Sequence, residues 1–315
     1  MTPLGALAPA LPMLCDKLGP AVDTSVRRAN SWVDDFDHGS SMGELPASYV
    51  QGHVGMGGVS KHFIHNNHWM VDIRSDSGQY PTLLAAWMRP NTAFRPQADG
   101  SVVIEFEVAT PIAGTRDTNA ISDSWPEFAI STAPTPSGIN WWGSPFLRNG
   151  TYFYESFSHA DVMGCRMQQS RHPICAFYGA GSDGAGAPDR DWEINQNGTD
   201  VTAGSEYGGD PQVPGLANAW ATCSSTDDAD TVCRNTFRVT LTADHIRIDV
   251  KRPGGNWVRY YEATPCNDRA GCATGQMARI LNNPGGFYVY FADFAYRIAN
   301  DEVIRFHWDH LAVNP

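Results

Sequence analysis

The amino-acid sequence predicts one all-β domain, a jelly-roll sandwich of two stacked antiparallel sheets with long decorated loops. Runs that alternate apolar and polar residues recur from Trp32 to Val313, and clusters of Gly, Pro, Asn and Asp separate them. The chain holds 30 glycines and 21 prolines, a bias typical of turns rather than of helical bundles. Its 315 residues suit a single decorated sandwich.

The expected strands follow this alternation along the chain. The clearest is 101–109, Ser-Val-Val-Ile-Glu-Phe-Glu-Val-Ala, which an Ala-Asp-Gly turn introduces. Between 235 and 262 the segments Thr-Ala-Asp-His and Arg-Pro-Gly-Gly-Asn have turn chemistry, which predicts a meander of three strands. Short helices are expected at 12–28 and 81–88. The expected strands besides 101–109 are 125–131, 151–156, 235–242, 245–251, 257–262, 287–291 and 303–313.

The chain divides into an N-terminal segment and one domain. Residues 1–30 are expected to be a signal remnant or a docking arm, and residues 31–315 form the jelly-roll domain. Within the domain, residues at about 179–234 are rich in Gly, Asp, Asn and Pro, which predicts a loop-rich insert. Loops of that length in a compact domain tend to be functional.

Six of the seven cysteines fall into three short-range couples, a spacing that suits disulfides across loops. Reduced, buried thiols remain the alternative. Disulfides would indicate an oxidising compartment, so a secreted or extracellular protein is expected, with the periplasm and the cell surface included. The couples are Cys165 with Cys175, Cys223 with Cys233, and Cys266 with Cys272.

The net charge of −12 restricts the partners. A strongly acidic protein repels phosphate backbones and anionic lipid, which argues against nucleic acid and membrane surfaces. No run approaches the length of apolar residues that a spanning helix needs. A neutral or cationic ligand fits this charge better.

Both ends of the predicted domain resemble a known superfamily. The segment 31–39, Ser-Trp-Val-Asp-Asp-Phe-Asp-His-Gly, resembles the opening strand of concanavalin-A-like lectin and glucanase domains, as in glycoside hydrolase family 16. Segment 306–313 resembles their closing strand, and 237–250 their strand-turn-strand. The resemblance implies the two-sheet fold and a polysaccharide or glycan as partner. The family's Glu-x-Asp-x-x-Glu run is absent; the nearest segment is Asp-Trp-Glu-Ile-Asn at 191–195.

The same resemblance suggests either solvent contact or a structural calcium ion for the acids of the opening strand. Asp35 and Asp37 flank Phe36, and Asp309 lies in the closing strand. Calcium takes several oxygen ligands, which acids from both chain ends could supply. No cofactor is required for the expected chemistry.

Carboxylates are the groups that glycoside cleavage needs, one protonated and one ionised. Glu127 is the first candidate because Ala129 and Ser131 share its face of the expected strand and leave room around the acid. A desolvated glutamate is the usual general acid. Asp191 and Glu193, which flank Trp192 in the insert, are candidates for the second group, and an exposed loop is the alternative for them.

A histidine-rich segment, 61–69, offers a further site. His62, His65 and His68 recur every three residues, which would line one side of a helix for zinc or copper but alternate faces on a strand. The Asn66–Asn67 pair favours a turn, and a plain surface loop is a third interpretation. The residues expected to line a substrate groove are His65, Asn67, His68, Trp69, Trp141 and Trp142.

Two functions follow from these observations. The first is a secreted polysaccharide-degrading enzyme that cleaves glycosidic bonds with a carboxylate pair in a sheet groove, as a glycoside hydrolase or a polysaccharide lyase. The alternative is a non-catalytic glycan-binding module, or a cell-surface or structural module, on the same fold.

Overall fold

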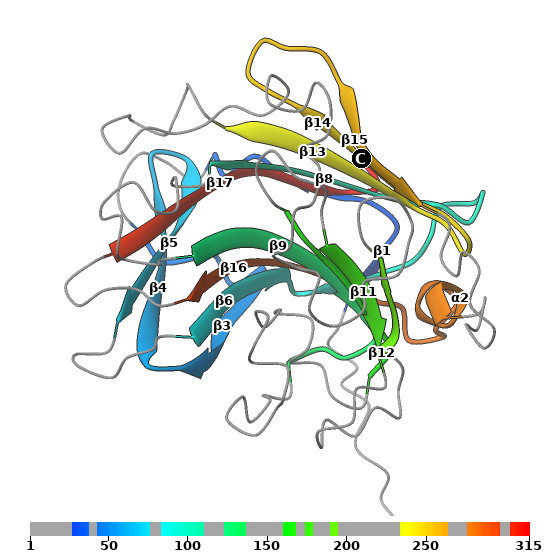
Figure 1. Ribbon diagram of the computed structural model, residues 1–315, viewed down its shortest axis with the longest axis horizontal. Coiled ribbons are helices and arrows are strands. Elements are labelled where there is room, and N and C mark those ends of the chain that lie inside the picture. The colour runs from blue at the N-terminus through cyan, green and yellow to red at the C-terminus, as the bar shows by residue number, and fades with distance from the viewer. Residues whose placement is uncertain are drawn as a thin grey trace, which may run out of the picture.

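Two antiparallel sheets stack face to face in this protein, which confirms the predicted jelly-roll sandwich (Figure 1). The computed structural model describes residues 27–37, 43–75, 83–109, 123–136, 160–167, 174–178, 190–194, 234–263, 276–296 and 303–315. The seven-stranded sheet has the order β12-β11-β10-β9-β16-β6-β3. The eight-stranded sheet has the order β15-β14-β13-β8-β17-β5-β4, and β2 also pairs with β17.

The seven-stranded sheet consists of β3 (Tyr49–Met56), β6 (Leu83–Pro90), β9 (Asp123–Ser131), β10 (Val162–Arg166), β11 (Ile174–Tyr178), β12 (Arg190–Ile194) and β16 (Tyr288–Tyr296). The eight-stranded sheet consists of β2 (Trp32–Asp34), β4 (Gly58–His65), β5 (His68–Ser75), β8 (Val102–Ala109), β13 (Asn235–Leu241), β14 (Ile246–Lys251), β15 (Val258–Ala263) and β17 (Val303–Val313). The remaining elements are β1 (Arg27–Ala29), β7 (Thr92–Phe94) and α2 (Gln276–Leu281).

Alternation along β8 shows how the sequence builds a layer. Val102, Ile104 and Phe106 are buried, whereas Glu105 and Glu107 between them are only half-buried. Since successive side chains point to opposite faces of a strand, the apolar set enters the space between the sheets and the acids face outward. The predicted meander is also present, because β13 pairs with β8 and β14, and β14 pairs with β15.

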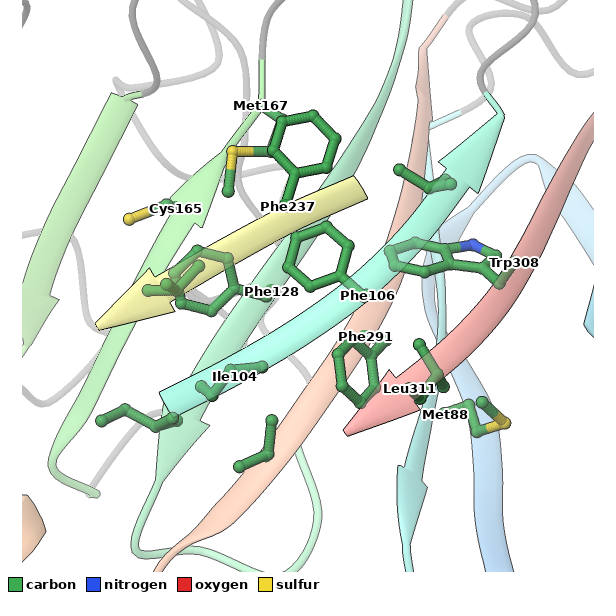
Figure 2. Packing of buried hydrophobic residues seen from close by; sticks show 14 of the residues in the cluster. Met88, Ile104, Phe106, Phe128, Cys165, Met167, Phe237, Phe291, Trp308 and Leu311 are labelled. Atoms are coloured by element: carbon green, nitrogen blue, oxygen red, sulfur yellow. The ribbon is translucent and has the colours of Figure 1, made fainter. Parts of the chain in front are cut away.

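The core is centred on Phe106, where side chains from both sheets meet (Figure 2). The ring of Phe106 lies 5.2 Å from that of Phe237 and 5.5 Å from that of Trp308 within its own sheet. Across the sandwich it lies 5.8 Å from Phe291 and 6.1 Å from Phe128. These contacts fix the two sheets against each other.

The segment 81–88 was expected to be helical, and this prediction is wrong: residues 83–90 form β6. Every described side chain of β6 is buried, so the period of two that reveals a strand is missing from its sequence. The strand is held by pairing with β3 on one side and β16 on the other. The short helix α2 was not expected. Residues 12–26 and 151–156 lie outside the described part of the chain.

Strands from early and late in the described part of the chain lie side by side. Strand β2 pairs with the end of β17, with Asp34 opposite Leu311. Strand β17 itself lies in the middle of its sheet, between β8 and β5. Residues 27–29, which belong to the expected N-terminal segment, form β1 and pair in parallel with β7. The domain boundary at residue 30 stays a prediction.

Candidate functional site

The outer face of the seven-stranded sheet carries Glu127 at its centre. The core residues Phe128 and Met88 point between the sheets, so Glu127 and Trp87 point to the opposite face. Ala292 of β16 pairs with Glu127 on one side and with Trp87 on the other. Directly paired residues share a face. The face therefore presents a carboxylate and an indole with only an alanine between them.

Residues next to the row of Trp87, Ala292 and Glu127 hold Trp87 in place. Gly52 pairs with Trp87, and a Cβ atom at Gly52 would approach the Trp87 ring to 2.9 Å. The absence of a side chain at Gly52 therefore lets the indole lie against the backbone of β3. The Trp87 ring meets Tyr290 edge to face at 5.7 Å. The Trp87 Nε1 is buried and has no hydrogen-bond partner among the described residues.

An arginine closes one end of this face. Arg89 is buried, and its Nε donates to the Pro134 carbonyl over 2.7 Å. Its guanidinium lies 4.5 Å from the centre of the Tyr288 ring. The hydroxyl of Tyr290 donates to the Ala133 carbonyl. These contacts tie the segment that follows β9 onto the sheet next to Glu127.

Asp293 is a second buried acid, and sequence reasoning missed it. It follows Ala292 in β16 and points between the sheets, where its Oδ2 accepts a hydrogen bond of 2.8 Å from Trp308 Nε1. Its Oδ1 has no hydrogen-bond partner among the described residues. Burial raises the pKa of Asp293 well above its usual value, and nearby Glu127 adds to the rise, against the opposing hydrogen bond from Trp308. The signal was a lone acid in the apolar run of β16.

Replacement of Asp293 by asparagine is expected to flatten the pH dependence of stability. In the wild type the folded state keeps the Asp293 proton while the unfolded chain releases it above about pH 4, so the free energy of unfolding falls as pH rises from there. The limiting slope for one such group is about 1.4 kcal/mol per pH unit. Asparagine stays neutral in both states and keeps an acceptor for Trp308.

Urea denaturation of both proteins from pH 4 to pH 8 measures this difference. The stability of Asp293→Asn relative to the wild type should rise steadily with pH. Any constant offset between the two proteins reflects the amide donors and carries no information about titration. Two parallel curves would show that Asp293 binds its proton equally in the folded and unfolded states.

The other predicted acids lie at the far edge of this sheet. Glu193 is in β12, opposite Ala176, and β12 is three strands from β9. The strand pairings place Glu193 in line with Ala129 of β9, which is two residues from Glu127. From the spacing between strands and the rise per residue, Glu193 and Glu127 are roughly 16 Å apart at the backbone. That exceeds by far the separation of about 5.5 Å in a retaining carboxylate pair. Asp191 lies in the same edge strand.

The histidine-rich segment is a β-hairpin, as the Asn66–Asn67 turn predicted. Both asparagines have positive φ, at 52° and 61°, and His65 pairs with His68. A helix that gathers the three histidines on one side is therefore excluded. Trp69 packs between the sheets at 5.4 Å from Trp308, which removes it from an open groove.

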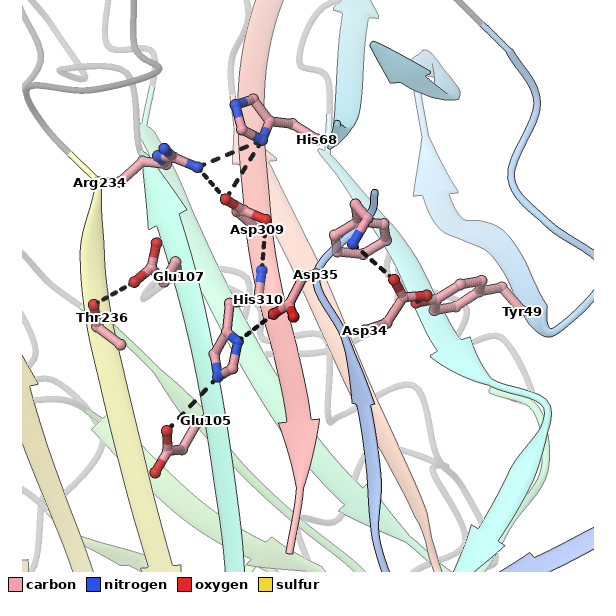
Figure 3. Close-up of polar contacts among 11 residues, drawn as sticks. Asp34, Asp35, Tyr49, His68, Glu105, Glu107, Arg234, Thr236, Asp309 and His310 are labelled. Atoms are coloured by element: carbon pink, nitrogen blue, oxygen red, sulfur yellow. Dashed lines mark hydrogen bonds and ion pairs between the residues drawn. The ribbon is translucent and has the colours of Figure 1, made fainter. Parts of the chain in front are cut away.

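Two of the three acids proposed for calcium, Asp309 and Asp35, contact basic side chains of the protein itself (Figure 3). The carboxylate of Asp309 binds Arg234 and lies 3.6 Å from His68 Nδ1. Asp35 Oδ1 lies 2.6 Å from His310 Nδ1, and Asp37 is exposed. Within the described ranges, no group of three or more His, Cys, Asp or Glu side chains could hold a metal ion. The residues found here do not fit a calcium ion at Asp309.

The predicted disulfides and tryptophan platform are only partly within the described structure. Cys165 is buried and lies directly opposite Cys175 in the pairing of β10 with β11, a register that suits the predicted bond. Among the described residues, no helix is long and apolar enough to cross a membrane. The predicted residues outside the described ranges are Trp141, Trp142, Cys223, Cys233, Cys266 and Cys272.

Comparison with known proteins returns similar folds at low identity. No protein-family model and no curated protein matches the sequence. An endo-1,3-β-glucanase from Streptomyces sioyaensis is 14% identical, with a TM-score of 0.48 over 94% of this chain and 98% of that one. The laminarinase catalytic domain from Thermotoga petrophila is 13% identical, with a TM-score of 0.43 over 90% and 95%. Lectin II from Ulex europaeus is 8% identical, with a TM-score of 0.42 over 90% and 98%.

The matching structures are glucanases and lectins, the two groups to which the sequence resemblance pointed. Similarity at this level shows no function for this chain.

Proposed function

We propose that this protein is a secreted polysaccharide-degrading enzyme that cleaves glycosidic bonds on the outer face of its seven-stranded sheet, with Glu127 as the proton donor. The observation that carries the proposal is the row of Trp87, Ala292 and Glu127 across β6, β16 and β9. Secretion rests on the predicted disulfides, for which the opposed positions of Cys165 and Cys175 are the support.

The row has the chemistry of a sugar-binding subsite. Indole rings pack against the apolar face of a pyranose, while acids and ring N–H groups bind its hydroxyls. Trp87 and Glu127 are two strands apart, about 10 Å at the backbone, with only the methyl group of Ala292 between them.

Glu127 suits the role of the acid because its side chain is buried. Carboxyl groups in apolar surroundings keep their proton to higher pH, as a general acid must. In the reaction, Glu127 donates its proton to the glycosidic oxygen, the bond from that oxygen to the anomeric carbon breaks, and water attacks the carbon. A second carboxylate takes the proton of the water. Asp293 acts only through Glu127, because it points away from this face.

Glu193 or Asp191 in β12 is the proposed second carboxylate. The backbone separation of roughly 16 Å between Glu193 and Glu127 exceeds the carboxyl separation of inverting enzymes, about 6.5–9.5 Å, so the two side chains have to extend toward each other for a joint reaction.

Glu127→Gln tests the proposal. The amide keeps the size of the side chain but has no proton to donate, so release of reducing ends from a panel of polysaccharides should fall by about 10²- to 10⁴-fold with substrate binding retained. Glu262→Gln is the matched control, because Glu262 is exposed in the other sheet, where it pairs with His245 and Arg259. Full activity of Glu127→Gln would end the assignment.

A specific observation also favours glycan binding without cleavage. Among the strand residues of this face whose side chains the structure describes, Glu127 is the only carboxylate. A binding module needs no second acid. The same experiment separates the two functions: a polysaccharide retained by wild-type protein without release of reducing ends, and retained less by Trp87→Ala, identifies a binding module.

A further inference from the structure

A tryptophan on the opposite side of the sandwich gathers two cations of the eight-stranded sheet. Trp257 directly precedes β15 and is half-buried. The guanidinium carbon of Arg238 lies 4.3 Å from the centre of its ring, and the Lys251 ammonium lies 5.1 Å from it. Figure 1 shows β13 and β14, which carry these cations, in the layer opposite β9 and β16. This Trp257 surface therefore faces away from Glu127.

The strand register explains why the cations point outward. Phe237 and Val239 enter the core, so Arg238 between them faces outward. Val250 also enters the core, so its neighbour Lys251 faces outward. In the register of β13 with β14, Arg238 lies opposite Asp249. Both cations thus lie on strands that are paired on both sides.

Much of the hydrogen-bonding capacity of these cations is unused. Lys251 makes no hydrogen bond or ion pair with any described residue, and its contact is the Trp257 ring. Arg238 uses its Nε for Glu105 at 2.5 Å, which leaves its terminal nitrogens without a partner among the described residues. The acid nearest in register, Asp249, is bound by both Nε and a terminal nitrogen of Arg247. The nearby acids Glu105 and Asp249 are thus already bound by arginines. The Lys251 ammonium and the terminal nitrogens of Arg238 keep hydrogen-bond donors that no described residue uses.

We propose that Trp257, Lys251 and Arg238 form a second binding surface for an acidic polysaccharide, one whose sugars carry carboxylate or sulfate groups. The ammonium and the guanidinium supply charge-assisted hydrogen bonds to the anionic group. The Trp257 indole and the neighbouring Val258, which is 40% exposed, supply apolar surface for the sugar ring. Cations that converge on an aromatic ring fit this ligand better than a neutral one.

The net charge of the whole protein makes a local cationic site necessary for binding a polyanion. With a net charge of −12, the protein repels polyanions at long range, so retention by an acidic polysaccharide requires a local cationic site. The inference rests on the proposed function only in taking a polysaccharide as ligand. The Trp257 surface and Glu127 lie on opposite faces, so each fails or holds independently.

Affinity electrophoresis tests the surface directly. The wild-type protein is run at low ionic strength in native gels that contain polygalacturonate, dextran sulfate or a neutral β-glucan. We expect retardation in one or both polyanion gels, and loss of it when salt is added, since screening weakens charged contacts. Trp257→Ala and Lys251→Ala should each weaken retention about five- to ten-fold, whereas Trp257→Phe should keep most of it.

Lys61→Ala is the matched control. Lys61 lies on the outer face of the same sheet and makes a similar contact with an aromatic ring, that of Phe63, but this ring is buried. The Lys61→Ala variant removes the same charge as Lys251→Ala. It should leave retention in the polyanion gels unchanged, and it should also leave unchanged the cleavage that Glu127 supports. No retardation of the wild type by either polyanion, or equal losses in Lys251→Ala and Lys61→Ala, overturns the proposal. Thermal unfolding of each variant confirms that it is folded.

Discussion

Replacement of Phe106 by alanine is expected to lower the free energy of unfolding by about 4 kcal/mol, the loss typical of a large aromatic truncated in a core. The Phe106 side chain is fully buried and meets four aromatic rings, two of them across the sandwich. Truncation removes all four contacts and leaves a cavity that the paired strands around it cannot close. Urea denaturation followed by tryptophan fluorescence measures the loss.

Two comparison variants make the Phe106 result specific. Phe106→Leu keeps an apolar side chain at the centre and should cost clearly less than the alanine variant. Val258→Ala removes an exposed side chain and should change stability by no more than about 0.5 kcal/mol. A loss below about 1 kcal/mol for Phe106→Ala would contradict the packing of Figure 2, because no buried phenylalanine in a closed core is so cheaply removed.

The second large effect is expected from His62 in acid. Burial and the nearby His53 lower the pKa of His62 to about 4. Its ring stacks on Trp69 at 5.8 Å, and its Nε2 lies 3.3 Å from Ser60 Oγ. As pH falls from about 6.5 to 4, the unfolded chain takes up a proton that the folded protein refuses, so stability falls. For this shift the loss is about 2–3 kcal/mol, reduced because the ring is partly exposed.

His62→Phe isolates this contribution. Phenylalanine can stack on Trp69 but does not titrate, so the variant should lose less stability than the wild type between pH 7 and pH 4, whatever its stability at pH 7. Denaturation curves at both pH values give the comparison. Asp293 does not confuse it, because that group is present in both proteins. His245→Gln, at a half-buried histidine paired with Glu262, serves as the control. Equal acid losses in His62→Phe and wild type would refute the assignment.

The sequence predicted the strands that have one solvent-facing side. The prediction was wrong for β6, which is buried on both faces. β8 and β13 alternate buried and half-buried residues, so their period of two was visible. In β6, Leu84 to Arg89 are all buried, and a run of Leu, Ala, Trp and Met without alternation is equally compatible with a helix. Only the partners on both sides, β3 and β16, decide the matter, and they are distant in sequence.

The candidate site was foreseen in part for the same reason. Glu127 stood out because small residues follow it on its own face, a local pattern. Trp87 was hidden in the segment expected to be a helix, and its relation to Glu127 through Ala292 depends on two strand pairings. Asp293 finds its hydrogen-bond donor in the other sheet. The calcium prediction was made from acidic residues alone, and Arg234, far away in sequence, already binds one of them.

The position of β17 determines when the protein can fold. It is the last described strand, yet it lies between β8 and β5, and β2 from the other end of the chain also pairs with it. Until residues 303–313 leave the ribosome, β8 and β5 expose unpaired edges to which other chains could add. The central layer of this sheet can therefore close only after β17 has been made, and the many long-range pairings make that closure slow.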